Sequence, residues 1–443
     1  MALKGLDIFK LTPKTNCKAC GNPTCMAFAM KVAQGSVSLD KCPHLSAEAL
    51  AALGEATAPP MKAIRIGAGE EEHSLGGETV LFRHDKTFVS KTLYGVTVNA
   101  GNIDTRLPEL AKVDYERIGE RMYVELINLE YAGDKEAFLG AVKKAAGSGR
   151  TLILDVRDPD AARAALELTK AGKPILNGAN ESNYKEMSAL ALEAGVTLGV
   201  TGANLDGICD TLTAIEGTGN KNLIIDLGSA SVKEAFANAV QIRRGALKDG
   251  NRSLGYPSLV NAAKLAPDNP TMQLALASLF TVKYGSVVIL DGMSYAQALP
   301  LYGLRQNIFT DPQKPMKVEP GIYPINGADE NAVCATTVDF ALTYFIVSGE
   351  IERSGIPVNL LISDAGGYSV LTAWAAGKLS AGSMARFFKE KAIDDKIKNR
   401  NLIIPGKVAV LKGELEENLP GWKIIVAPNE AVGVVKFLKE FNG

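Results

Sequence analysis

Short apolar runs alternate with amphipathic stretches between residues 61 and 325. The amphipathic stretches repeat apolar positions every three or four residues and predict helices, for example at 135–146, 160–171, 184–194 and 233–244. The apolar runs are continuous, as expected for parallel strands that are covered on both faces. They predict eight strands, at 92–100, 122–129, 151–156, 174–178, 197–201, 222–227, 258–262 and 286–291. Eight strand–helix units over about 250 residues predict a TIM (β/α)8 barrel.

The same alternation continues on a smaller scale in residues 326–443. Strands are predicted at 333–337, 358–363, 401–404 and 423–427, and helices at 340–353, 370–376, 384–393 and 430–441. This pattern predicts a doubly wound, flavodoxin-like α/β domain. Ligands of such domains bind at the carboxyl ends of the strands.

Residues 1–58 form a third block, which ends before the stiff pair Pro59-Pro60. Helices are predicted in this block at 24–33 and 46–53. The stretch 319–327 carries two Pro and two Gly, and it is predicted as a hinge after the barrel. The predicted domains are therefore 1–58, 61–325 and 326–443.

Composition and charge exclude several classes of protein. The 443 residues are 47% hydrophobic and carry 48 basic and 49 acidic side chains, for a net charge of −1. This chain has no positive field to attract nucleic acid or anionic lipid. The longest stretch without a charged residue, 269–282, is shorter than the about 20 apolar residues of a membrane-spanning helix. The first residues lack an apolar signal core, so a cytoplasmic protein is expected.

Four of the six cysteines follow one another with the spacing Cys-x2-Cys-x4-Cys-x16-Cys, at Cys17, Cys20, Cys25 and Cys42. Four thiolates suit a metal that prefers soft donors, and the candidates are an iron–sulfur cluster and structural zinc. Zinc ribbons usually present two Cys-x2-Cys knuckles, and this chain has one. A cytoplasmic setting disfavours disulfides, and free thiols are the remaining alternative.

Two loops of small residues follow predicted strands of the last block, at Thr336-Thr337 and at 364–369. Such loops suit a large ligand that approaches the backbone closely, although ordinary α/β turns have the same composition. The chain has no Walker A motif, and 67–69 lacks the third glycine of a dinucleotide fingerprint. Nucleotide binding is therefore not expected.

Acidic residues end three of the predicted barrel strands, at Asp155, Asp226 and Asp291. The carboxyl-terminal rim of a TIM barrel is where its chemistry usually takes place. Helix capping and solvation are the favoured explanation of such residues, so no catalytic residue is assigned.

The cysteine segment has a wider motif around it. Residues 12–30, TPKTNCKACGNPTCMAFAM, followed by Cys42-Pro43, resemble the N-terminus of the large (gamma) subunit of the corrinoid iron–sulfur protein of the reductive acetyl-CoA (Wood–Ljungdahl) pathway. The resemblance covers the whole chain and includes 81–86, 241–244 and 404–406.

This resemblance implies that Cys17, Cys20, Cys25 and Cys42 bind one 4Fe-4S cluster. It also implies a corrinoid of the cobalamin type in the last block. The implied contacts are Thr336, Thr337, Thr343, Gly366, Gly367, Tyr368, Ser369, Val370, Leu371, Thr372, Ala431 and Gly433. No histidine follows His84, so the last block has no imidazole for the lower face of cobalt. A base-off corrinoid without a protein His ligand is therefore expected, which favours the Co(I) state.

The family's function implies a methyl carrier and not an independent enzyme. A separate methyltransferase would pass the methyl group of methyltetrahydrofolate to the cobalt, and acetyl-CoA synthase would receive it. The cluster would relay electrons that regenerate Co(I). The implied partners are these two enzymes, a small subunit that forms a heterodimer, and a reductive activator. The alternatives are a methyltransferase that binds methyltetrahydrofolate in its own barrel and an electron-transfer subunit without corrinoid.

Overall fold

The computed structural model describes residues 5–33, 37, 39–46, 49–50, 60–228, 231–311 and 316–441. Two compact units divide the chain, 1–309 and 310–443, and each is described by itself. In the part of the chain that is described, every helix is too short or too polar to span a bilayer.

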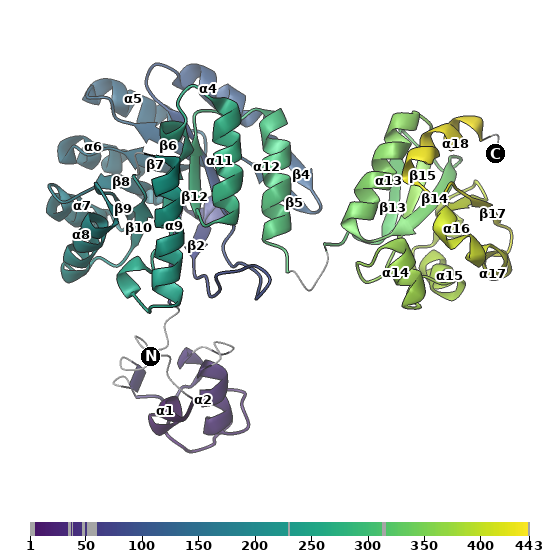
Figure 1. Cartoon of the computed structure of the whole chain (residues 1–443), viewed down its shortest axis with the longest axis horizontal. Helices are drawn as coiled ribbons and strands as arrows, with labels where there is room; N and C mark the ends of the chain where they lie inside the picture. The colour runs from purple at the N-terminus through teal and green to yellow at the C-terminus, as the bar shows by residue number, and fades with distance from the viewer. Residues whose placement is uncertain are drawn as a thin grey trace. The chain divides into compact units, whose positions relative to one another are not determined.

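Eight parallel strands of the first unit close into a barrel (Figure 1). They are β3 (Leu93–Val98), β6 (Leu126–Glu130), β7 (Thr151–Asp155), β8 (Ile175–Ala179), β9 (Thr197–Val200), β10 (Leu223–Asp226), β11 (Ser258–Asn261) and β12 (Val287–Leu290). Each strand pairs with the next along the chain, and β12 pairs with β3 to complete the ring. The predicted TIM barrel and its eight strands are confirmed.

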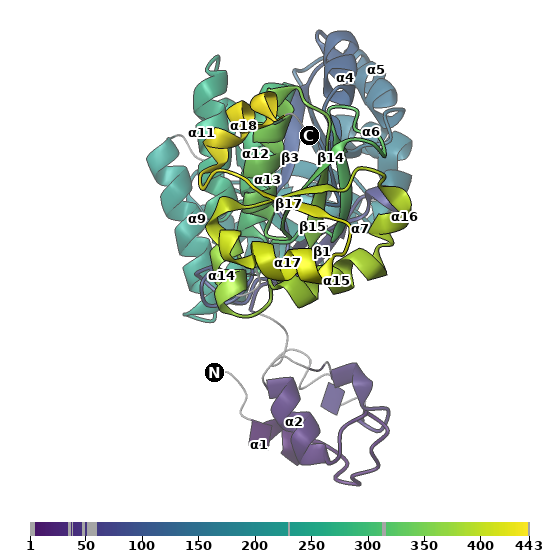
Figure 2. The same ribbon diagram turned by 90° about the vertical axis from the view of Figure 1, so that its right-hand side faces the viewer.

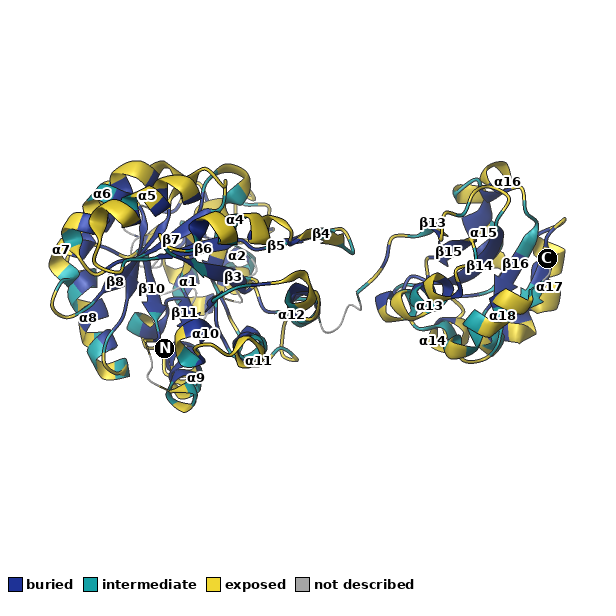
Figure 3. Cartoon of the chain, turned by 90° about the horizontal axis from the view of Figure 1, so that it is seen from above, coloured by how far each residue is buried: buried dark blue, intermediate teal, exposed yellow. Residues whose placement is uncertain are grey.

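Helices surround the barrel, with exposed residues outward and buried residues toward the strands (Figure 3). They are α4 (Ile103–Ala111), α5 (Lys135–Ala146), α6 (Pro159–Thr169), α7 (Tyr184–Ala194), α8 (Leu205–Gly217), α9 (Val232–Leu247), α10 (Ala262–Leu265), α11 (Pro270–Val282) and α12 (Tyr295–Ile308). Several begin at a side chain that caps the first turn. Asp134, Asp158 and Asn204 accept hydrogen bonds from backbone N–H groups three residues later, at 2.8–3.0 Å.

A hairpin that the sequence did not predict lies at the amino-terminal end of the barrel. Strands β1 (Ala63–Ile66) and β2 (His73–Gly76) pair antiparallel. Ile64, Ile66 and Leu75 of this hairpin share one buried cluster with the first residues of the barrel strands, such as Leu126 and Ile175. The hairpin therefore closes this end of the barrel with apolar side chains. A second hairpin, β4 (Asp114–Arg117) with β5 (Glu120–Tyr123), precedes β6.

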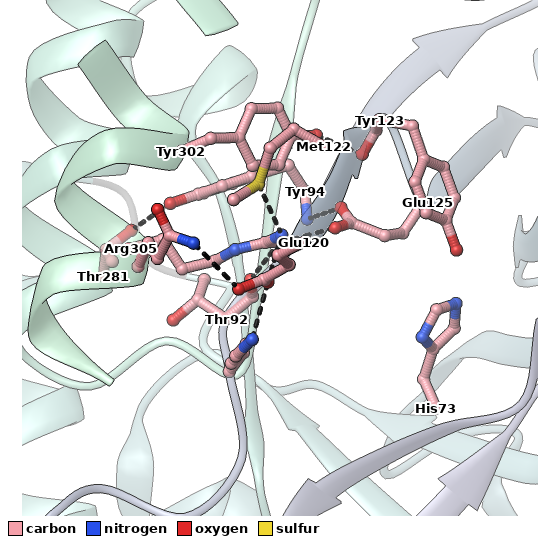
Figure 4. Close-up of polar contacts among 12 residues, drawn as sticks. His73, Thr92, Tyr94, Glu120, Met122, Tyr123, Glu125, Thr281, Tyr302 and Arg305 are labelled. Carbon is pink, nitrogen blue, oxygen red and sulfur yellow. Dashed lines mark hydrogen bonds and ion pairs between the residues drawn. The ribbon is translucent and has the colours of Figure 1, made fainter. Parts of the chain in front are cut away.

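A buried arginine joins α12 to the strands (Figure 4). Arg305 is 3% exposed and donates to the Glu125 carboxylate at 2.5 Å and to the Thr92 carbonyl at 3.0 Å. Its guanidinium also lies over the ring of Tyr302, 4.5 Å from the centroid. Burial penalises an unpaired charge heavily, so this ion pair holds α12 in place.

The second unit contains one five-stranded sheet, β13 (Gly321–Ile325), β14 (Val333–Val338), β15 (Val358–Ser363), β16 (Asn401–Ile404) and β17 (Lys423–Val426), in the order β13-β15-β14-β16-β17. The last four strands are parallel and match the four predicted ones. The helices are α13 (Ala341–Ser354), α14 (Val370–Ala375), α15 (Ala381–Glu390), α16 (Ile393–Lys396), α17 (Lys412–Asn418) and α18 (Val434–Glu440) (Figure 2). Helix α13 packs on α18, and α15 packs on α17.

The edge strand β13 corrects the sequence analysis. Residues 321–325 pair antiparallel with β15 and so belong to this sheet, which means that the predicted hinge at 319–327 is wrong. The two compact units divide earlier, between 309 and 310. Pro324 fits here because an edge strand has one side without ladder partners.

Near the N-terminus, α1 (Gly5–Lys10) packs on α2 (Cys25–Ala33), and a 3-10 helix, η1, spans Leu39–Lys41. The predicted helix at 24–33 corresponds to α2. Most of the second predicted helix, 46–53, and Pro59 lie outside the described residues.

Replacing Arg305 with methionine should lower the free energy of unfolding of the barrel by about 3–5 kcal/mol, because Glu125 would remain buried without its counter-ion. Urea denaturation of the full chain measures this loss. Arg121→Met is the matched control, since Arg121 pairs with Asp114 at the surface and should cost less than about 1 kcal/mol. Equal losses in the two variants would contradict a special role for the buried pair.

Candidate functional site

The four clustered cysteines differ in exposure. Cys25 opens α2 and is buried, and Cys42 is buried directly after η1. Cys20 is half-buried and packs against the apolar cluster that contains Cys42. Cys17 is exposed. The structure therefore brings Cys20 and Cys42 to one small core and leaves Cys17 accessible to solvent.

The loop that carries the first two cysteines turns sharply. Lys14, Asn16 and Lys18 have positive φ angles of 57°, 48° and 62°, which are uncommon outside glycine. The side-chain oxygen of Asn16 accepts a hydrogen bond from the backbone N–H of Cys25 at 2.8 Å. This bond ties the loop to the start of α2.

Polar groups of the same loop point to the thiols. The backbone N–H of Ala19 and the hydroxyl of Thr15 lower the pKa of the Cys17 thiol. The amide nitrogen of Asn22 lies 3.7 Å from the sulfur of Cys20. The thiolate is the form of cysteine that binds metals, so this environment fits a thiolate-bound group such as an iron–sulfur cluster.

The four cysteines do not form a preassembled site for one ion. Among the described residues, no three His, Cys, Asp or Glu side chains are grouped tightly enough to hold a metal ion. The fit of this segment to an iron–sulfur cluster therefore depends on its four thiol donors and on the tight loop that carries Cys17 and Cys20.

The second unit has a cavity of about 320 Å³ at the carboxyl ends of β14, β16 and β17. Residues of α13, α14 and α18 complete its wall. The volume is in the range of pockets for small molecules and cofactors. Seven of the expected corrinoid contacts line the cavity: Thr336, Thr337, Thr343, Ser369, Val370, Leu371 and Ala431.

The other expected contacts are not among the lining residues. These are Gly366, Gly367, Tyr368, Thr372 and Gly433. Gly366 and Gly367 have positive φ angles of 71° and 78°, and they form the turn that leads into α14.

One polar group of the cavity wall has no partner. The hydroxyl of Thr337 is buried without a hydrogen bond in the described structure, whereas the hydroxyl of Thr336 donates to the Leu361 carbonyl at 3.0 Å. A buried hydroxyl without a partner costs free energy unless a ligand or water satisfies it. A ligand with peripheral amide groups, such as a corrinoid, fits this donor and acceptor.

The sequence analysis missed an ion pair and several apolar side chains of the wall. Lys407 and Glu430 pair at 3.2 Å beside the cavity. The missed apolar residues include Ile346 and Ile351 on α13 and Phe437 on α18. The run of apolar residues Leu342, Phe345 and Ile346 on α13, all exposed in the structure, is a signal that could have pointed to this face of the helix.

The barrel rim holds a separate polar cluster. The amide nitrogen of Asn177, in β8, donates to Asp226 at 2.9 Å and to Asp155 at 3.3 Å. Lys264, on α10, donates to Asp155 at 2.7 Å. Sequence analysis named both aspartates but missed Asn177 and Lys264. The four residues lie far apart in the sequence, on β7, β8, β10 and α10, and only the closed barrel brings them together.

Three of these side chains, Asp155, Asp226 and Lys264, line a cavity of about 120 Å³, whereas Asn177 does not. Burial raises the pKa of Asp226, and the nearby charge of Asp155 adds to the shift. The third strand-end aspartate, Asp291, lies elsewhere and accepts from Gln273 at 2.6 Å. The cluster can therefore bind a ligand that offers N–H donors.

Comparison with known protein families adds two matches. The family described as the CO dehydrogenase/acetyl-CoA synthase delta subunit matches residues 63–438. A family described as a putative Fe-S cluster matches residues 13–44, which include all four clustered cysteines.

Similar proteins match over nearly the entire chain. The corrinoid/iron-sulfur protein large subunit of Moorella thermoacetica is 40% identical and covers 99% of both chains. The acetyl-CoA decarbonylase/synthase complex subunit gamma of Methanothermobacter thermautotrophicus is 30% identical with the same coverage. The subunit gamma 2 of Methanosarcina thermophila is 33% identical over 96% of each chain. The chain therefore belongs to the family of corrinoid/iron-sulfur protein large subunits, which includes the gamma subunits of acetyl-CoA decarbonylase/synthase complexes.

Proposed function

We propose that this protein is a methyl-carrier subunit that binds a corrinoid in its C-terminal unit and a 4Fe-4S cluster at Cys17, Cys20, Cys25 and Cys42. The observation that carries the proposal is the 320 Å³ cavity at the strand ends, lined by seven of the expected corrinoid contacts. The parallel strands and the position of the cavity support a flavodoxin-like corrinoid domain.

When bound, the corrinoid cobalt supplies the centre that accepts and releases the methyl group, and the cluster supplies the electron that restores its Co(I) state. The chain's own residues hold these groups. The apolar wall of the cavity excludes water from the macrocycle, and Thr337 offers a hydrogen bond to one of its amides. The unit contains no histidine, so no imidazole of this unit would ligate the cobalt of a bound corrinoid, which would favour the Co(I) state.

The proposed partners follow from the same role. A methyltransferase would supply the methyl group from methyltetrahydrofolate, and acetyl-CoA synthase would accept it. The similar proteins named above are subunits of larger assemblies, which supports a small subunit as the heterodimeric partner. A reductive activator would deliver electrons to the cluster. These reactions take place in the cytoplasm.

Filling the cavity should prevent corrinoid binding. Ala431 lines the cavity, and its neighbour Val432 is 71% exposed and does not. Ala431→Trp should weaken the binding of cobalamin at least tenfold because the indole occupies the cavity, whereas Val432→Trp should leave the affinity unchanged. Titration of the cofactor-free protein, followed by visible absorption, measures both. Unchanged affinity in Ala431→Trp would place the corrinoid elsewhere.

Removing a cluster ligand should separate electron relay from corrinoid binding. Cys20→Ser should lose iron but keep cobalamin, and it should still accept a methyl group after chemical reduction of the cobalt. Reactivation by a protein reductant should fail. Iron and cobalt analysis with methyl-transfer assays checks each step, and Cys209→Ser is the matched control, because Cys209 lies on a barrel helix. A variant without iron that the protein reductant reactivates at the normal rate would refute the relay.

The polar cluster at the barrel rim supports a second candidate, in which the barrel itself binds methyltetrahydrofolate. The pterin ring presents N–H donors that suit the carboxylates of Asp155 and Asp226, both of which line the cavity. The chain would then be a methyltransferase for its own corrinoid.

Calorimetric titration with methyltetrahydrofolate tests this candidate. If the barrel is a methyltransferase site, the full chain binds methyltetrahydrofolate. Asp226→Asn should then weaken binding about tenfold, since the carboxylate that would accept N–H groups of the pterin ring is lost. Asp291→Asn, a strand-end aspartate outside the cavity, should bind as the unchanged protein does. Absence of binding by the unchanged protein removes the candidate and leaves the carrier role intact.

A further inference from the structure

A fully buried carboxylate lies behind the cavity of the C-terminal unit. Asp339 directly follows β14 and has no exposed surface. Its carboxylate accepts hydrogen bonds from the backbone N–H of Ala365 at 3.0 Å and from that of Gly367 at 3.0 and 3.1 Å. Lys317 provides the counter-charge, with its amine 3.3 Å from the carboxylate.

This carboxylate connects two segments that line the cavity. Thr336 and Thr337 precede Asp339 on β14, and the turn that it holds leads directly to Ser369. The backbone N–H of Asp339 also donates to the Ser363 carbonyl at 3.1 Å. The ladder between β14 and β15 ends at Val338 and Ser363, and beyond it the carboxylate of Asp339 ties the turn at 364–369 to the end of β14.

Asp339 is also hydrogen-bonded to the entry segment of the C-terminal unit, residues 316–318. The backbone N–H of Val318 donates to the Asp339 carbonyl at 2.8 Å, and the N–H of Ala341 donates to the Met316 carbonyl at 3.0 Å. Together with the Lys317 ion pair, these bonds fasten residues 316–318 to the end of β14. Lys317 is thus in direct contact with the carboxylate that holds the turn, and its two neighbours bind the backbone beside it.

We propose that Asp339 is a positioning residue for the corrinoid cavity, and that Lys317 links the entry segment of the unit to the turn that Asp339 holds. The inference rests on the proposed function, because it assumes that the cavity takes a corrinoid. Asp339 itself does not line the cavity. It acts through the turn at 364–369, whose backbone N–H groups are fixed by a charged acceptor.

The charge of the carboxylate is essential to this arrangement. Hydrogen bonds to an ionised acceptor are about twice as strong as neutral ones. One oxygen of Asp339 accepts from both the Ala365 and the Gly367 amides, and the other faces Gly367 and the amine of Lys317. An asparagine keeps one acceptor oxygen but places an NH2 donor where the second oxygen was, and it carries no charge. The turn is then held by weaker, neutral hydrogen bonds, and the ion pair with Lys317 is lost, while the shape of the side chain is nearly unchanged.

The experiment compares Asp339→Asn with Asp329→Asn in the full chain, using cobalamin as the probe. Asp329 is a carboxylate in the loop before β14, at the opposite end of that strand, and its side chain accepts from the N–H of Asn331 at 2.9 Å. We expect cobalamin to bind Asp339→Asn about tenfold more weakly, a loss of about 1.4 kcal/mol. The visible spectrum of the bound corrinoid should also shift, because its surroundings change. Asp329→Asn should alter neither.

Hydrogen exchange gives a readout without cofactor. In the unchanged protein the amides of Ala365 and Gly367 should exchange slowly, and in Asp339→Asn they should exchange at least tenfold faster. Lys317→Met should weaken cobalamin binding about threefold, as expected for a half-exposed ion pair. If Asp339→Asn does not fold, Lys317→Met provides the test: weaker cobalamin binding supports the inference, and unchanged binding overturns it.

The outcomes separate the inference from the proposed function. If the unchanged protein binds no cobalamin, the proposed function fails and the inference about the cavity fails with it. If the unchanged protein binds cobalamin but Asp339→Asn binds it equally well with the same spectrum, only the inference is overturned. Weaker binding in both aspartate variants would indicate a general loss of stability and would also overturn it.

Discussion

In both compact units the strands that carry the candidate sites run parallel, so each strand brings its carboxyl end to the same edge of its sheet. Parallel strands need a crossover connection, and in this chain helices provide it and cover the strands. Polar residues that are far apart in sequence therefore meet at one edge. Asp155, Asn177 and Asp226 meet in this way at the barrel rim, as do Thr337 and Ser369 in the second unit.

The barrel rim and the sheet edge of the second unit differ in the volume of the cavity at the strand ends. Side chains fill the closed barrel, and the rim retains a cavity of about 120 Å³. The open sheet of the second unit is not closed on itself, and helices α13, α14 and α18 leave about 320 Å³ at its edge. The cavity of the second unit is within the size range of pockets for small molecules and cofactors, whereas the cavity at the barrel rim is smaller than that range.

Buried charges in this protein join segments that are distant in sequence. Arg305 connects the last barrel helix to Glu125, and Arg243 pairs with Glu78 at 3.4 Å. Asp339 has the same role in the second unit, where its carboxylate binds the amine of Lys317 and two backbone amides. An unpaired buried charge raises the free energy of the folded state by about 3–5 kcal/mol. Any arrangement that separates such a pair is therefore strongly disfavoured, so the pair fixes the relative position of the two segments that carry it.

Continuous apolar runs were sufficient to predict the barrel and the four parallel strands of the second unit, because a strand that is covered on both faces is apolar along its whole length. The candidate cluster ligands could be named because the four cysteines lie within residues 17–42 of the sequence. The hairpin that closes the barrel was not predictable, since Ile64 and Leu75 are buried in a cluster with residues of barrel strands that are distant in sequence. Strand β13 was mistaken for a hinge because Gly321 and Pro324 are typical of turns, and only pairing with β15 made them an edge strand. Asp339 illustrates the same limit: its sequence neighbourhood shows an ordinary aspartate after a strand, and the fold alone decides that backbone amides and a lysine surround it.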